Sequence, residues 1–284
     1  MQVKETKMTG KVINTRLGDI EYSSTGNGMP IIFVHGGHSN CHETLCLKGF
    51  DVEKFQLITP SRPGYGKTTL KGNRSSRQAA DLIIELLDQL SIDQVIVYGI
   101  SAGGLTAIEL AANYPNRVSK LILASAISKK WLEDNGKIYK TAQRIFNPKV
   151  EKFTWGMVRF FSSIFPTMIA KSFYPQFSKK AMNGLKGEDI TELISAMKHY
   201  RSGRGFLNDI HQTIKDSTIA EIQCPTLIIH SRNDNSVPFE HALHAKKMIK
   251  NSKLVELDNE WGHLFWIGTD SMNSINKILK FIDE

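Results

Sequence analysis

The chain of 284 residues is 41% hydrophobic and 23% charged, a balance that excludes a mainly disordered protein. It carries a net charge of +8 but no recognised nucleic-acid-binding motif, so we expect no nucleic-acid partner. The N-terminus lacks the apolar core of a signal peptide, and no stretch approaches the roughly 20 apolar residues of a membrane span. The three cysteines (Cys41, Cys46 and Cys224) lack the spacing of a zinc site or a disulfide framework. We therefore expect the protein to be located in a reducing cytoplasm.

The first half of the chain alternates short apolar runs with helical patterns. Lys11–Thr15 and Asp19–Tyr22 alternate in polarity around a turn at Gly18, which predicts a hairpin. Ile31–Gly37 is a continuous apolar run ending in glycines, as in a strand buried on both faces of a parallel sheet. Further strands are predicted at Phe55–Thr59, Gln94–Tyr98 and Ser119–Ala124, and helices at Arg77–Leu90 and Leu105–Tyr114.

The alternation stops near Ser128. Residues 128–215 look helical and contain no clear buried strand. The earlier pattern then resumes with Pro225–His230, Phe239–Lys250, Lys253–Leu257 and a final amphipathic helix. Strands that alternate with helices predict an α/β fold with a mostly parallel sheet and helices on both faces. We therefore predict a core made of residues 1–127 and 216–284, with residues 128–215 inserted as a helical cap.

A candidate nucleophile lies where the strand that ends near Tyr98 meets the next helix. Gly99-Ile100-Ser101-Ala102-Gly103 matches G-x-S-x-G, which places a serine on a sharp strand-to-helix turn. Small residues two places before and after the serine are needed because this turn leaves no space for side chains. A phosphate-binding turn is the alternative, but the G-x-x-x-x-G-K-[ST] and G-x-G-x-x-G patterns are absent. We predict Ser101 as the nucleophile.

A serine hydroxyl needs a general base, and the base needs an orienting carboxylate. In folds that place a serine on this kind of strand-to-helix turn, the order along the chain is serine, acid, histidine. Asp234 lies in a turn just after the strand Pro225–His230, and His263 lies in the loop before the last helix. Asp258, which also follows a strand, is the alternative acid. We favour Asp234 for its loop context, and His263 as the base.

The loop after Ile31–Val34 and the residue after the nucleophile are the expected oxyanion donors. Two backbone N–H groups aimed at the developing oxyanion stabilise it by a few kcal/mol, on the order of 3. We predict Ala102 and Gly37 as these donors, with Gly36 or His38 as alternatives to Gly37.

At this point the residues resemble a known family, the α/β-hydrolase superfamily with a helical cap. The matching segments are FVHGG (Phe33–Gly37), SRPGYGKT (Ser61–Thr68), GISAGG (Gly99–Gly104), PTLIIHSRNDNSVP (Pro225–Pro238) and WGHLFWIG (Trp261–Gly268). The resemblance implies an eight-stranded, mostly parallel sheet and a two-step mechanism without a cofactor or metal. Relatives more often carry an acidic residue at the position of Ser61, so a structural contact should differ there.

The predicted cap holds the excess positive charge. Residues 128–215 contain 16 Lys/Arg and 7 Asp/Glu, whereas the rest of the chain contains 20 and 21. An apolar set in the cap follows helical spacing at positions 157, 160, 161, 164, 165 and 168. We expect this apolar face to pack onto the core, with a pocket wall and a membrane-surface contact as alternatives. For the charge we expect a solvated face, with steering of anionic substrates or docking on anionic lipid as alternatives.

The substrate is expected to be a small molecule with an apolar acyl or alkyl group. Its pocket is predicted between core and cap. The residues expected to line it are His38, Ile100, Trp155, Phe161, Phe165, Val237 and Leu264.

These residues predict a serine hydrolase that cleaves a carboxylic ester or a related acyl bond. Because the family also includes lipases, thioesterases and C–C bond hydrolases, the resemblance defines the catalytic residues and leaves the bond open. The alternatives are a C–C bond hydrolase acting on a keto acid, perhydrolysis through a peracid, and a small-molecule receptor with low turnover. No oligomeric state is predicted.

Overall fold

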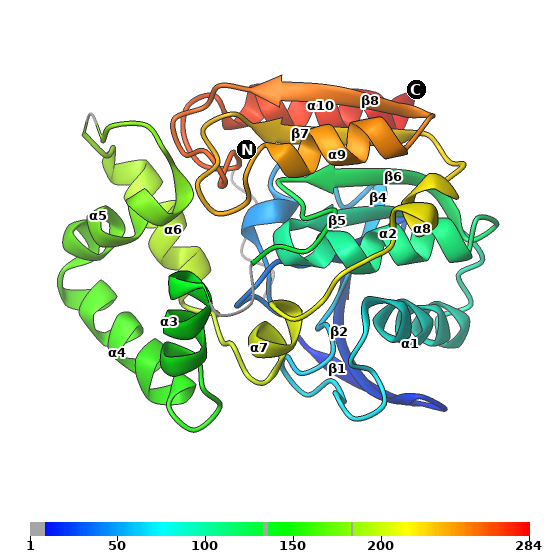
Figure 1. The fold of residues 1–284 in the computed structure, drawn as a ribbon, viewed down its shortest axis with the longest axis horizontal. Helices are drawn as coiled ribbons and strands as arrows, with labels where there is room; N and C mark the ends of the chain where they lie inside the picture. The colour runs from blue at the N-terminus through cyan, green and yellow to red at the C-terminus, as the bar shows by residue number, and fades with distance from the viewer. Residues whose placement is uncertain (1–8, 133–135, 183) are drawn as a thin grey trace.

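One eight-stranded sheet forms the centre of the protein. The computed structural model describes residues 9–132, 136–182 and 184–284. Within them the strand order is β1-β2-β4-β3-β5-β6-β7-β8 (Figure 1). The strands are β1 (Lys11–Thr15), β2 (Gly18–Thr25), β3 (Met29–Val34), β4 (Phe55–Pro60), β5 (Val95–Ile100), β6 (Val118–Ala124), β7 (Thr226–Ser231) and β8 (Ser252–Leu257).

The sheet is mostly parallel, as predicted. β2 pairs antiparallel with both β1 and β4, and every other neighbouring pair is parallel. In β3, Ile31 pairs with Leu57 on one side and Ile96 on the other. Successive residues of a strand point to opposite faces, so Ile32 and Phe33 enter different cores and both are fully buried. The continuous apolar run of β3 follows from burial on both faces.

Helices cover both faces of the sheet (Figure 1). α1 (Ser76–Gln89), α2 (Gly104–Asn113) and α9 (Glu240–Met248) pack on one face, and α10 (Ser271–Asp283) packs on the other. α1 begins at a capping box, in which the Ser75 side chain accepts from Gln78 N and the Gln78 side chain accepts from Ser75 N. The short helix α8 (Asp216–Ala220) contacts α2 and α9. The predicted arrangement of sheet and helices is confirmed.

The segment between β6 and β7 is a helical insertion, as expected. Its helices in the described residues are α3 (Lys137–Ile145), α4 (Glu151–Ile164), α5 (Pro166–Phe177), α6 (Gly187–Met197) and α7 (Gly205–Asp209). In Figure 1 α3 to α6 lie to one side of the sheet, and α7 lies between them and the core. The division of the chain at residues 128 and 215 remains a prediction.

The apolar stripe of α4 faces solvent, which contradicts the prediction that it packs onto the core. Phe160 is 57% exposed, and Met157, Ile164, Phe165 and Met168 are also exposed. Phe161 is the half-buried member of the set. The other side of α4, which includes buried Trp155, packs inward. Helical spacing therefore identified the stripe but not the direction in which it points.

Two short 3-10 turns complete the core. η1 (Leu45–Leu47) follows β3, and η2 (Ser101–Gly103) joins β5 directly to α2. The second turn carries the candidate nucleophile at the carboxyl end of the central strand. In open α/β sheets, sites gather at this edge.

Candidate active site

Ser101 stands on a strained turn between β5 and α2. Its φ is 50°, in the left-handed region that few residues other than glycine adopt. A Cβ at Gly99 would lie 2.4 Å from Ala107 Cβ, and a Cβ at Gly103 would lie 2.1 Å from Val34 O. The two flanking glycines therefore let the strand, the turn and the helix approach closely enough to hold the serine at the apex.

His263 and Asp234 form a hydrogen-bonded pair. His263 Nδ1 lies 2.7 Å from Asp234 Oδ2, and both side chains are buried. Asp234 Oδ1 accepts from the backbone N–H groups of Ser236 and Val237, each at 2.8 Å. Burial alone would raise the pKa of Asp234, but the charge of His263 and the hydrogen bonds from His230 and His263 lower that pKa to about 2. The carboxylate is thus ionised and fixes Nδ1 of His263 as a donor.

The alternative acid, Asp258, lies outside this arrangement. Its side chain is 78% exposed and forms an ion pair with Lys180 at 2.9 Å. It also accepts from the side-chain amide of Asn233 at 2.6 Å. Its contacts are therefore with surface groups, and Asp234 is the carboxylate next to His263.

A second histidine, which the sequence analysis took only as the end of a strand, contacts the same carboxylate. His230 Nε2 lies 3.1 Å from Asp234 Oδ2 and 2.9 Å from Val237 O. Nδ1 of this buried ring has no hydrogen-bond partner among the described residues. Both neighbours of Nε2 are acceptors, so Nε2 carries the proton and donates. The only sequence signal was its position, four residues before Asp234 at the end of β7.

The end of β6 holds the nucleophile and base segments next to each other. The backbone N–H of Ile127 donates to Ser101 O at 3.0 Å. The Ser125 hydroxyl donates to His263 O at 3.0 Å. Ser101, His263 and Asp234 thus belong to the same edge of the sheet, at the carboxyl ends of β5, β8 and β7.

The loop after β3 passes close to Ser101. A Cβ at Gly36 would lie 3.0 Å from Ser101 Cβ, and a Cβ at Gly37 would lie 3.1 Å from the Phe206 ring. His35 braces the loop, because its Nε2 accepts from the backbone N–H of Arg62 at 2.9 Å. Ala102 is buried at the start of the turn that follows the serine. These positions suit the predicted oxyanion donors Gly37 and Ala102, which remain predictions.

Arg62 joins the same loop to the cap. Its guanidinium donates to His35 O and Gly36 O, and it forms a buried two-bond ion pair with Asp209 at the end of α7, both bonds being 2.7 Å. The Tyr65 hydroxyl donates to the same carboxylate at 2.6 Å. Burial would lower the pKa of Arg62, but Asp209 raises it, so the charge is kept. The sequence analysis did not identify this network.

His38 lies among aromatic rings of the cap. Its ring stacks on Phe206 with centroids 3.9 Å apart, and the Phe146 and Trp155 centroids lie at 4.3 and 5.2 Å. Ser202 Oγ accepts from Trp155 Nε1 at 2.7 Å and lies 2.8 Å from His38 Nδ1. Burial lowers the pKa of His38 to about 3, so the ring is neutral, and one hydrogen bond joins its Nδ1 to the Ser202 hydroxyl. Of these cap residues, only Trp155 was predicted.

The remaining predicted pocket residues have different surroundings. Ile100 and Leu264 are buried in one hydrophobic cluster, and Val237 packs with Ala102 in another. Phe161 is half buried on α4. Phe165 is 50% exposed at the junction of α4 and α5, with the outward-facing apolar residues of the cap. We therefore leave Phe165 out of the candidate site.

The end of α5 is joined by backbone hydrogen bonds to the loops that carry Asp234 and His263. Phe177 O accepts from His263 N at 2.9 Å and from Asn235 N at 3.2 Å, and Lys179 N donates to Asn233 O at 2.8 Å. Gly262 packs against this segment with a φ of 52°. Only glycine fits there, because a Cβ would lie 2.4 Å from Phe177 O. We call the contact of residues 177–179 with residues 233–235 and 263 the seam.

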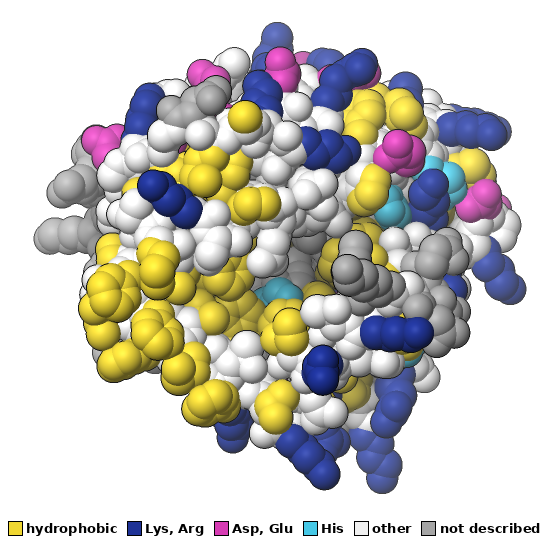
Figure 2. All heavy atoms as spheres, turned by 60° about the vertical axis from the view of Figure 1, so that its left-hand side comes forward, with side chains coloured by type: hydrophobic (Ala, Val, Ile, Leu, Met, Phe, Trp, Pro, Cys, Tyr) yellow, Lys and Arg dark blue, Asp and Glu magenta, His cyan; other side chains and the backbone are white. Residues whose placement is uncertain are grey.

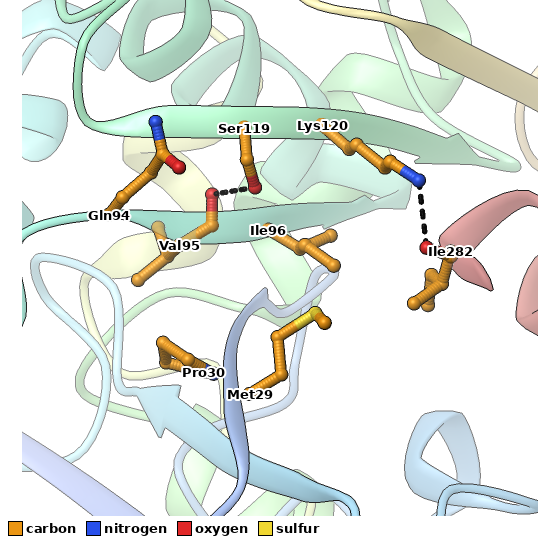
Figure 3. A pocket seen from close by; sticks show the side chains of 8 residues that line it. All are labelled: Met29, Pro30, Gln94, Val95, Ile96, Ser119, Lys120 and Ile282. Atoms are coloured by element: carbon orange, nitrogen blue, oxygen red, sulfur yellow. Dashed lines mark hydrogen bonds between the residues drawn. The ribbon is translucent and has the colours of Figure 1, made fainter. Parts of the chain in front are cut away.

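The space-filling view shows a hollow on the cap side, with apolar side chains around it and a histidine side chain at its floor (Figure 2). A different pocket lies between the amino ends of β3, β5 and β6 (Figure 3). Its lining includes Met29, Pro30 and Lys120, whose Nζ donates to Ile282 O. Ser101 stands at the opposite end of β5, so this second pocket is not part of the candidate site.

Ser61, where relatives more often carry an acid, contacts one instead. Its hydroxyl donates to Glu21 Oε2 at 3.0 Å and accepts from Cys41 N at 3.0 Å. Glu21, Cys41 and His42 bring potential metal-ligand atoms within 4.8 Å of one another. Burial raises the pKa of Cys41 to about 11, which disfavours the thiolate that a metal needs, so we assign no metal there.

Comparison with known proteins agrees with this architecture. Residues 29–268 match the family model of the alpha/beta hydrolase fold. "Uncharacterized hydrolase YcgS" of Bacillus subtilis (strain 168) is 39% identical over 274 residues, covering 94% of this chain and 95% of that protein.

Two relatives carry names that state a reaction. The "2-hydroxy-6-oxononadienedioate/2-hydroxy-6-oxononatrienedioate hydrolase 1" of Pseudomonas putida is 26% identical, covering 96% of each chain. The "Bifunctional esterase/perhydrolase DCH" of Acinetobacter calcoaceticus is 25% identical, covering 93% of this chain and 96% of that one. The solved structure of an alpha/beta hydrolase fold protein from Nakamurella multipartita superposes with a TM-score of 0.79 at 23% identity, covering 96% and 98% of the chains.

Proposed function

Because the chain belongs to the alpha/beta hydrolase fold family, we propose that it is a serine hydrolase that cleaves a carboxylic ester or a related acyl bond. The observation that carries the proposal is the 2.7 Å pair of His263 and Asp234 at the sheet edge where Ser101 occupies its strained turn. A serine on such a turn, a histidine and an ionised carboxylate are the groups that nucleophilic acyl transfer requires.

In the proposed mechanism, Ser101 Oγ attacks the carbonyl carbon and His263 Nε2 takes the hydroxyl proton. Nε2 is the accepting nitrogen because Nδ1 donates to Asp234. The backbone N–H groups of Gly37 and Ala102 bind the oxyanion. His263 then gives its proton to the leaving alcohol, and an acyl-enzyme remains. Water, deprotonated by His263, attacks the acyl carbon, and the acid leaves as Ser101 regains its proton.

We call the loop after β3, which carries the proposed donor Gly37, the oxyanion loop. An apolar acyl or alkyl group suits its surroundings. His38, next to Gly37, is held among Phe146, Trp155 and Phe206 as a neutral ring. Val237 is buried beside Ala102. We propose this aromatic wall and Val237 as contacts for the apolar part of the substrate, which enters through the hollow seen in Figure 2.

C–C bond hydrolysis of a keto acid is the second candidate, and it is favoured by the name of the Pseudomonas putida relative. An anionic substrate would call for a basic anchor in the pocket. Arg62 is the buried cation nearest to the oxyanion loop in the described network, and its charge is already paired with Asp209. Arg201, which is partly exposed, is paired with buried Glu151. These pairings favour the ester over the anionic keto acid.

The proposal is tested with p-nitrophenyl esters from acetate to laurate. We expect the wild-type protein to hydrolyse them and Ser101→Ala to lose about a thousandfold or more of the turnover. Ser163→Ala, which changes an exposed serine of α4, is the matched control and should keep wild-type activity. A fluorophosphonate probe gives a second readout, since it should label Ser101 of the wild type and leave Ser101→Ala unlabelled.

Three results would contradict the proposal. Retained turnover in Ser101→Ala would show that another group is the nucleophile. Inactivity of the wild type on every ester, with cleavage of a 2-hydroxy-6-oxo-dienoate that Ser101→Ala loses, would establish the C–C candidate. Tight small-molecule binding without labelling or turnover would instead indicate a receptor.

A further inference from the structure

The solvent-facing side of α4 is mainly apolar, with Lys152 and Ser163 as its other exposed residues. Phe153 is 72% exposed, Phe160 57% and Ile164 50%. Successive members of the stripe are three or four residues apart, so they form one line along the helix. We call this line and its continuation into α5 the outer face; it consists of Val150, Phe153, Met157, Phe160, Ile164, Phe165 and Met168.

The inner side of α4 contains polar as well as apolar residues. Glu151 is buried there and pairs with Arg201 at 2.8 Å, while Trp155 and Ser162 are also buried. A helix on the surface of a globular protein normally turns its apolar stripe to the core and its polar side to water. In α4 the line of large apolar residues faces water, although Trp155 and Val158 on the inner side join the core. Large exposed apolar patches mark interaction sites, so the outer face needs a partner.

Basic residues greatly outnumber acidic ones in the segment that carries the outer face. Between residues 139 and 182 there are eight basic residues, namely Lys140, Arg144, Lys149, Lys152, Arg159, Lys171, Lys179 and Lys180. The one acidic residue in this segment is Glu151, whose carboxylate is buried against Arg201, and Lys180 pairs with Asp258 from outside the segment. In Figure 2 apolar side chains gather on this side of the molecule, with Lys and Arg side chains along their lower edge. The partner should therefore be apolar inside and negative at its surface.

We propose that the outer face is a docking surface for an anionic lipid bilayer. Aromatic and aliphatic side chains would enter the boundary between headgroups and acyl chains, and the basic residues would bind the headgroup phosphates. No helix among the described residues is long and apolar enough to cross a membrane, so binding takes place at the surface. A second copy of this chain is disfavoured as the partner, because pairing two outer faces would bring their basic residues together.

Docking here would bring the bilayer close to the candidate site. The inner side of α4 reaches His38 through Trp155 and Ser202, whose hydroxyl contacts both side chains. An α-helix with its side chains is only about 10 Å across. An apolar substrate dissolved in the bilayer would thus lie near the cap side of the pocket. The docking itself does not depend on the proposed reaction, and its test measures binding alone.

Vesicle co-sedimentation of the full chain tests the proposal. We expect binding to vesicles of phosphatidylcholine mixed with phosphatidylglycerol, and little binding to phosphatidylcholine alone. Phe153→Ser/Phe160→Ser should weaken binding to the mixed vesicles about tenfold or more. Leu243→Ser/Met272→Ser is the matched control, because both residues are exposed and lie outside the outer face. Circular dichroism shows whether each variant remains folded.

The charge is tested separately. Lys149→Glu/Lys152→Glu should weaken binding about tenfold or more, whereas Lys250→Glu/Lys277→Glu, which makes the same change in net charge elsewhere, should weaken it much less. Equal binding to both kinds of vesicle, or wild-type binding by the outer-face variants, would overturn the proposal. So would light scattering that shows a dimer which Phe153→Ser/Phe160→Ser converts to a monomer, because the outer face would then bind a second copy.

Discussion

Two histidines donate to the carboxylate of Asp234, and they lie on different elements. His263 is placed by the loop before α10, whereas His230 is fixed within β7 and contacts the same oxygen, Oδ2. Since Nδ1 of His230 has no hydrogen-bond partner among the described residues, the hydrogen bonds of this ring are made by Nε2, and the Phe239 ring packs against it edge-on. We interpret His230 as a positioning residue that holds the carboxylate for His263.

Replacement of His230 tests this role. Leucine removes the donor, whereas glutamine can place its side-chain amide N–H near the position of Nε2. A hydrogen bond to a charged group contributes about 2 kcal/mol, so His230→Leu should lower kcat about thirtyfold with little change in KM. His230→Gln should recover most of the loss. If both variants lose activity equally while remaining folded, the ring acts through packing and not through its hydrogen bond.

The ionisation of Asp234 has a consequence for stability in acid. Its pKa falls from 3.8 to about 2 on folding, so the charged form is favoured in the folded protein. The stabilisation is complete above pH 3.8 and is lost as the pH falls towards 2. It amounts to about 2 kcal/mol. Asp234→Asn should lack this part of the pH dependence when free energies of unfolding are measured across that range; an unchanged slope would contradict the assignment.

At the scale of elements, two glycines can be compared. Gly103 lies in the turn between β5 and α2, and Gly156 lies in the middle of α4. A Cβ at Gly103 would lie 2.1 Å from Val34 O, but nothing lies within 4 Å of a Cβ at Gly156. Gly103→Ala should lower the free energy of unfolding by about 3 kcal/mol, since strand and helix would be forced apart. Gly156→Ala should raise it by about 1 kcal/mol through helix propensity. Denaturant titration distinguishes them, and similar effects of both changes would contradict this account of the turn.

The elements of the core could be predicted because each has a local cause. The burial of β3 on both faces produces its continuous apolar run, and the strained turn at Ser101 requires glycines at fixed distances along the chain. Asp234 and His263 could be predicted as candidates because loops after parallel strands meet at one sheet edge. Whether they serve as acid and base remains a prediction.

The cap was harder to predict, since its contacts are distant in sequence. His38 and Ser202 are 164 residues apart, and Arg62 and Asp209 are 147 apart. No local pattern connects such pairs. The periodicity of α4 predicts an apolar stripe in the same way for a buried and an outward-facing helix, so the expected packing of Met157 and Phe160 was wrong.

At the scale of the whole molecule, the Arg62–Asp209 pair joins the cap to the core at the oxyanion loop. Removing one partner of a buried ion pair leaves the other charge unpaired in the interior. Asp209→Ala should therefore lower the free energy of unfolding by about 3 kcal/mol or more. Arg16→Ala, which breaks the exposed pair with Glu85, should leave it nearly unchanged. Equal small effects in thermal unfolding would show that the buried pair is dispensable for joining cap and core.

The seam at the end of α5 limits how this chain can be recombined. Phe177 O accepts from the backbone N–H groups of His263 and Asn235, and Lys179 N donates to Asn233 O, so all three hydrogen bonds of the seam are made by residues at the end of α5, within the insertion. Residues 177–179 are counted with the cap by position but are hydrogen-bonded to the core loops that carry Asp234 and His263. A chimera that exchanges the cap for that of a relative should therefore keep these residues with the sheet. Within the family, the end of α5 should be inherited together with the loops around Asn233 and His263.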